Sequence, residues 1–107
     1  EAYSVADEAG IDLVVANDPD ADRLAVAMKT VDGWRQLSGD EVGLLLCDHQ
    51  LSNTTGDNRL TASSVVSSQA VAALCARRGV EHIRTLTGFK WIMEPAVKKP
   101  EARWIFG

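Results

Sequence analysis

The chain of 107 residues has few cysteines and no cysteine motif. Its two cysteines, Cys47 and Cys75, form no CxxC pair, and no paired His/Cys spacing supports a zinc site. A cysteine of this kind behaves as a small hydrophobic residue. We therefore expect both thiols to be buried and unpaired, in a protein of a reducing compartment.

Long hydrophobic runs and an excess of positive charge are also missing. Apolar runs such as residues 44–47 are far too short to cross a bilayer, and no basic segment followed by an apolar one marks a signal peptide. The 11 basic and 15 acidic residues give a net charge of −4, which provides no electrostatic attraction to nucleic acid or to an anionic membrane. We expect a cytoplasmic protein with no nucleic-acid or membrane partner.

The composition is that of an ordinary folded domain. Hydrophobic residues make up 46% of the chain and charged residues 24%, which argues against disorder, collagen and coiled coils. The chain has no initiator methionine, opens on a helical pattern that ends at Gly10, and closes on the strand-like run WIFG (residues 104–107). Both ends resemble cuts through a fold, so we expect a fragment of a larger protein.

The periodicity of apolar residues predicts alternating helices and strands. Helices are expected over residues 1–10, 38–51, 67–79 and 89–98, and strands over residues 11–16, 24–28, 35–37, 60–66, 80–86 and 102–106. Asp32-Gly33 is a hairpin signal, and Ser38 followed by Glu41 is a capping-box pattern. The alternation in the second half predicts an α/β fold with largely parallel strands, and the boundary between two pieces is expected near residues 34–38.

The sharpest chemical feature is a run of alternating carboxylates, DPDADR at residues 18–23, directly after an apolar strand. In a turning loop Asp18, Asp20 and Asp22 can converge, and converging carboxylates repel one another unless a cation lies between them. Oxygen ligands favour a hard divalent cation, and Mg²⁺ usually keeps positions open for water or phosphate. The planar guanidinium of Arg23 is suited to bidentate contact with a phosphate.

Other kinds of site also place carboxylates in such a loop. An EF-hand loop starting at Asp18 would need glycine at its sixth position and glutamate at its twelfth, where this chain has Arg23 and Lys29. A haloacid-dehalogenase-type phosphatase would use Asp18 as nucleophile, but that family expects a small pair such as Gly-Thr where Ala21-Asp22 stands. Such a phosphatase and a non-catalytic metal-binding domain are two alternative interpretations of this loop.

The run DPDADR resembles the metal-binding loop of the α-D-phosphohexomutases, the phosphoglucomutase and phosphomannomutase superfamily, in the form of its phosphoglucomutase-2 and phosphopentomutase branch. Three further segments are similar to family segments in the same order: SGDEVG (38–43), TLTGFKWI (85–92) and WIFG (104–107). The resemblance implies a three-layer α/β fold with a mixed, largely parallel sheet, truncated in this chain. Residues 1–37 would form the end of domain II with the metal-binding loop, and residues 38–107 most of domain III.

The resemblance also implies an activity for the parent enzyme. Such an enzyme is an intramolecular phosphotransferase of the isomerase class, which moves a phosphoryl group between C1 and C6 (or C5) of a sugar phosphate through a phosphoserine and a bisphosphate intermediate. The implied cofactors are Mg²⁺ and a sugar 1,6-bisphosphate activator. The implied partners are the phosphorylated sugar and the remaining domains of the same enzyme. Because the phosphoserine loop and the sugar-recognition loop are absent from this chain, we expect the fragment alone to be inactive.

The resemblance assigns roles to two groups of residues. In the first group, Asp18, Asp20 and Asp22 would bind Mg²⁺, and Asp22 would also face the sugar. Arg23 would contact the transferring phosphate as a catalytic and substrate-binding residue.

The second group is a turn between a strand and a helix. There Thr87 would contact the substrate, and Gly88 would let the backbone approach it closely.

Overall fold

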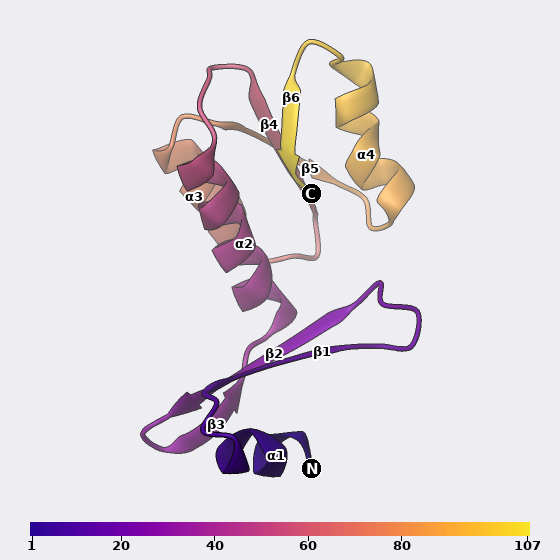
Figure 1. Cartoon of the computed structure of the whole chain (residues 1–107). Helices are drawn as coiled ribbons and strands as arrows, with labels where there is room; N and C mark the ends of the chain where they lie inside the picture. The colour runs from indigo at the N-terminus through magenta and orange to yellow at the C-terminus, as the bar shows by residue number, and fades with distance from the viewer. The chain divides into compact units, whose positions relative to one another are not determined.

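The computed structural model describes all of residues 1–107, which divide into two compact units, Glu1–Val42 and Gly43–Gly107 (Figure 1). The helices are α1 (Ala2–Glu8), α2 (Gly39–Asn53), α3 (Ala70–Arg77) and α4 (Phe89–Lys98), and the strands are β1 (Leu13–Asn17), β2 (Leu24–Thr30), β3 (Gly33–Gln36), β4 (Arg59–Ser64), β5 (Glu81–Thr85) and β6 (Arg103–Phe106). Every helix and strand expected from the sequence is present, with bounds shifted by a few residues. None of the helices combines the length and the apolar character that crossing a membrane requires.

The first unit is an antiparallel sheet in the order β1-β2-β3, with α1 against β1. The expected hairpin between β2 and β3 is confirmed, because Thr30 pairs with Gly33 and leaves a two-residue turn. The φ of Gly33 is +112°, in the region that glycine adopts without strain. The ladder between β1 and β2 ends at the pair Asn17 and Leu24, and the carboxylate loop connects the two strands beyond this pair.

Polar and aromatic contacts hold α1 on its sheet. The ring of Tyr3 stacks on that of Trp34, with centroids 5.0 Å apart and planes 6° from parallel. The carboxylate of Asp7 accepts hydrogen bonds from the Lys29 ammonium and from the Trp34 ring N–H. These bonds, led by that of Lys29, hold the pKa of Asp7 below its ordinary value, so the helix stays attached through an ionised group.

The second unit is a parallel sheet in the order β5-β4-β6, covered by helices on both faces. The chain moves from β4 to β5 through α3, and then crosses back over β4 to β6 through α4. Because crossovers between parallel strands are right-handed, opposite directions of travel put the two helices on opposite faces. Figure 1 shows α2 and α3 on one side of this sheet and α4 on the other. The predicted α/β class is confirmed; the parallel pairing lies in this unit, and the first unit is antiparallel.

The core of the second unit lies between its sheet and the pair of helices α2 and α3. Its buried members are Cys47, Leu51, Val71, Cys75 and Val80. Both cysteines are fully buried and free, with sulfur atoms 3.9 Å apart, which confirms the expectation of buried, unpaired thiols. Burial, together with the neighbouring thiol, raises the pKa of Cys47 to about 12.

The predicted capping box at the start of α2 is confirmed. The Ser38 backbone N–H donates to the Glu41 carboxylate at 2.8 Å, and the Glu41 backbone N–H donates to the Ser38 hydroxyl at 3.2 Å. Arg35 at the end of β3 forms an ion pair with the same carboxylate. The hydrogen bond from the Ser38 N–H is the main cause of the lowered pKa of Glu41. The box therefore fixes where β3 ends and α2 begins.

Candidate metal and phosphate site

The loop between β1 and β2 begins with a tight turn. The Ala21 backbone N–H donates to the Asp18 carbonyl at 3.0 Å, which makes residues 18–21 a β-turn. Proline at the second position presets φ, and aspartate and glycine are favoured at the next two positions. Here Ala21 takes the glycine position with φ +57°, a left-handed conformation that an L-residue adopts only at a cost. The sequence DPDA therefore folds as a turn that glycine would enter more easily.

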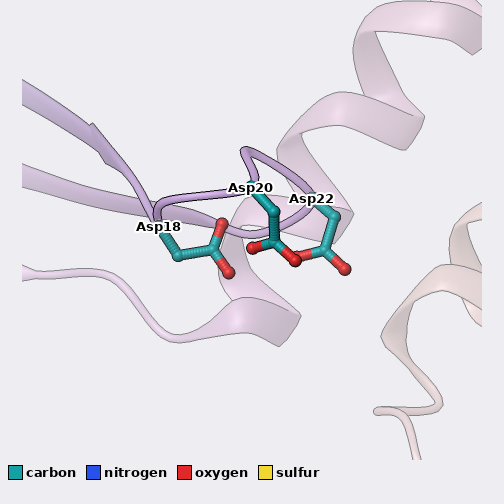
Figure 2. A group of neighbouring side chains, drawn as sticks. All are labelled: Asp18, Asp20 and Asp22. Atoms are coloured by element: carbon teal, nitrogen blue, oxygen red, sulfur yellow. The ribbon is translucent and has the colours of Figure 1, made fainter.

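This turn gathers the three carboxylates of the loop. One oxygen each from Asp18, Asp20 and Asp22 can be chosen so that all three lie within 4.8 Å of one another. Figure 2 shows the carboxylate groups collected on one side of the loop. Asp18 is half-buried, whereas Asp20 and Asp22 are exposed. Three carboxylate oxygens at this spacing match the donor set of a hard divalent cation such as Mg²⁺.

Arg23 is bound to the same cluster from the far end of the loop. Its Nε donates to Asp18 Oδ2 at 2.6 Å, and its backbone N–H donates to Asp18 Oδ1 at 3.1 Å. Its Nε also lies 3.5 Å from Asp22 Oδ1. Partial burial opposes the ionisation of Asp18, but the bonds from Arg23, together with the contacts to Asp20 and Asp22, outweigh it, so the pKa of Asp18 lies below its ordinary value. Asp18 is thus held as a carboxylate, the form that binds a cation.

The sequence indicated no role for Asn17, which follows the strand expected at residues 11–16. The structure makes it the last residue of β1. Its side-chain amide donates to the Arg23 carbonyl at 3.2 Å and so closes the base of the loop. An asparagine at the end of a strand, with a side chain suited to bonding nearby backbone groups, was the available signal.

The predicted substrate residues Thr87 and Gly88 lie in the second unit, between β5 and α4. Both are exposed. The backbone of Gly88 has φ +122° and ψ 144°, a combination almost confined to glycine. The structure thus brings the four residues of the carboxylate loop together in the first unit, and Thr87 and Gly88 belong to the second unit, in a turn that requires glycine.

Comparisons with known proteins agree with this architecture. Residues 38–107 match the model of a family described as phosphoglucomutase/phosphomannomutase, alpha/beta/alpha domain III. In an alignment of 102 positions that covers 91% of this chain, it is 40% identical to a protein of Schizosaccharomyces pombe named "Probable phosphoribomutase". In an alignment of 100 positions that covers 85% of this chain, it is also 40% identical to the protein of Homo sapiens named "Phosphopentomutase".

The chain spans only a small part of these relatives, 17% of the yeast protein and 16% of the human one. Among solved structures, it is similar to an N-acetylglucosamine-phosphate mutase of the α-D-phosphohexomutase superfamily in its apo form. The TM-score is 0.59 at 22% identity, over 78% of this chain and 20% of the other. At this identity the likeness concerns the fold.

Proposed function

Because this chain belongs to the phosphoglucomutase/phosphomannomutase family, we propose that it is part of a Mg²⁺-dependent phosphosugar mutase. The enzyme moves a phosphoryl group between C1 and C6 (or C5) of a sugar phosphate in the cytoplasm. It works through a phosphoserine and a bisphosphorylated sugar that acts as activator. Residues 1–37 form the end of its second domain, and residues 38–107 most of its third.

The observation that carries this proposal is the convergence of three carboxylates and an arginine on one loop of a chain from this family. In the proposed enzyme, Asp18, Asp20 and Asp22 bind Mg²⁺. The cation, when bound, neutralises charge that develops on the phosphoryl oxygens during transfer. The guanidinium of Arg23 adds hydrogen bonds to the same phosphate without changing its protonation state. Its exposure of 79% leaves it accessible to a ligand.

The turn at residues 87–88 has a different role in the proposal. Thr87 offers a hydroxyl to the sugar phosphate, and Gly88 has no side chain to keep the ligand away from the backbone. The other domains of the enzyme supply the phosphoserine and the remaining sugar contacts. Residues 1–107 alone are therefore expected to bind the cation but to show no mutase turnover.

The proposal is tested with the parent protein, assayed with the 1-phosphates of glucose, mannose, ribose and deoxyribose. Each assay is run with and without Mg²⁺ and a sugar bisphosphate. We expect turnover of at least one sugar, dependent on both additions, and its loss in Asp20→Asn. Asp32→Asn is the matched control, because Asp32 is an exposed aspartate in the other hairpin of the same unit. Absence of turnover with every sugar, or equal loss in both variants, contradicts the proposal.

A trapping experiment on the same parent protein distinguishes the mutase from a phosphatase that uses Asp18 as nucleophile. Both oxygens of Asp18 accept hydrogen bonds from Arg23, an arrangement that favours a ligand role over attack on phosphorus. Trapping with beryllium fluoride or with borohydride is expected to leave Asp18 unmodified. An acyl-phosphate at this residue would favour the phosphatase.

A further inference from the structure

We propose that Asn17 is a positioning residue, which aims Arg23 and thereby preassembles the three carboxylates before a cation arrives. The inference rests on the proposed function, because it concerns the affinity of the same loop for a divalent cation. It begins from a physical difficulty. Three carboxylates with oxygens within 4.8 Å repel one another, so other contacts must keep the loop in its gathered form.

The contacts that do so converge on Arg23. Its backbone N–H and its Nε both donate to Asp18, at 3.1 and 2.6 Å. Its carbonyl accepts from the amide of Asn17 at 3.2 Å. The peptide groups on both sides of the Arg23 Cα are therefore fixed, and with them the direction in which the side chain leaves the backbone.

Asn17 is suited to this role by its place in the sheet. It is the last residue of β1 and pairs with Leu24 at the final rung of the ladder to β2. Its side chain therefore starts from an anchored backbone, while residues 18–22 have no ladder. The amide connects the anchored strand to the far end of the loop and limits the separation of its two ends.

Loss of this amide leaves the exposed Arg23 carbonyl to water, so the fold survives. Arg23 then samples other orientations, its bonds to Asp18 are made for less of the time, and repulsion spreads the carboxylates. Cation binding must re-order the loop, and ordering costs affinity. The expected loss is roughly three- to tenfold, the equivalent of one net hydrogen bond.

The test uses the 107-residue chain and Mn²⁺, a paramagnetic substitute for Mg²⁺. The concentration of free Mn²⁺ is measured by electron paramagnetic resonance. Asn17→Ala and Asn17→Leu remove the donor, the second with little change in size. Asn58→Ala is the matched control: the exposed Asn58 amide also donates to a backbone carbonyl, that of Glu101, at 3.1 Å, but in the second unit. Hydrogen exchange of the Arg23 backbone amide, measured without metal, reports the positioning itself.

We expect both Asn17 variants to bind Mn²⁺ three- to tenfold more weakly and to exchange the Arg23 amide faster, while Asn58→Ala matches the unaltered chain in both. Unchanged affinity and exchange in the Asn17 variants, or an equal loss in Asn58→Ala, overturns the positioning role while leaving the cation site in place. If no variant binds Mn²⁺, the proposed function fails at this site, and the exchange measurement alone then upholds or overturns the positioning of Arg23 by Asn17.

Discussion

Replacement of Ala21 by glycine should stabilise the first unit against unfolding and lower the affinity of its carboxylate loop for a divalent cation. Ala21 has φ +57°, and the left-handed conformation costs an L-residue about 1–2 kcal/mol. Glycine removes that cost but gains freedom in the unfolded chain, which offsets about 0.4–1 kcal/mol. The net gain for Ala21→Gly is therefore about 0.5–1 kcal/mol in the free energy of unfolding.

The reverse substitution at a matched position is the control. Gly10 lies in the same unit with φ +66°, and a Cβ added to it would meet nothing within 4 Å. Gly10→Ala should therefore lower the free energy of unfolding by about 0.5–1 kcal/mol through conformation alone. Urea unfolding of the whole chain, followed by the circular dichroism signal of the stacked Tyr3 and Trp34 rings, should show midpoints shifted in opposite directions, each by roughly 0.5 M for a unit this small.

The cation affinity of Ala21→Gly should change in the other direction. A glycine loop has more conformations to lose when the carboxylates close on a cation, by about 0.5–1 kcal/mol, which corresponds to roughly two- to fivefold weaker binding. Gly10→Ala lies outside the loop and should bind Mn²⁺ as the unaltered chain does. A destabilised Ala21→Gly, or midpoints that move in the same direction, would refute the reasoning from φ. A stabilised Ala21→Gly with tighter binding would refute the link between loop stiffness and affinity.

Three further outcomes follow from the second unit. Burial, and then the charge of Arg84, lowers the pKa of His82. The neutral imidazole therefore contributes stability above the pKa of the unfolded chain, about 6.5, and this contribution is lost as the pH falls below that value. The urea midpoints at pH 7.5 and pH 5.5 should differ less in His82→Gln than in the unaltered chain. Gly88→Ala should lower the free energy of unfolding by about 1–3 kcal/mol through backbone strain alone, because the added Cβ would lie 3.8 Å from the Trp91 ring, an ordinary contact. Urea unfolding measures this change, and an unchanged midpoint would contradict the argument from backbone strain. Burial raises the pKa of Cys47 to about 12, and both thiols are fully buried. Neither should therefore react with an aromatic disulfide reagent at pH 8 until urea unfolds the chain, and rapid labelling of the native chain would contradict this.

The sequence predicted the elements well where local rules decide them. The capping box at Ser38 and Glu41 and the turn before Gly33 are each set by residues within a few positions of one another. The parallel pairing of β4 with β5 and with β6 also followed from the alternation of helices and strands, whereas the order of the strands did not. In these places, local propensity and the final fold agree.

The finer features of the candidate site could not be predicted, because they depend on where the chain directs particular atoms. The spacing of Asp18, Asp20 and Asp22 indicated convergence, but it could not show that Arg23 binds Asp18 through both its backbone and its side chain. The role of Asn17 depends on the strand extending one residue further than its apolar pattern. A difference of one residue in where the strand ends decides whether the Asn17 side chain starts from a hydrogen-bonded strand or from a free loop.

The charge of the loop explains why a divalent cation suits it. Asp18, Asp20 and Asp22 contribute −3 and Arg23 contributes +1, so the cluster carries −3 + 1 = −2. A monovalent cation leaves this loop negative, and a phosphate dianion would then be repelled by it. A divalent cation brings the sum to zero, so that in the proposed enzyme the exposed guanidinium of Arg23 meets the phosphate with no surplus of negative charge beside it. Under the proposed function, the single arginine gathers the carboxylates before the cation binds and donates to the phosphate afterwards, so the binding of the cation and of the phosphate should be linked through this one side chain.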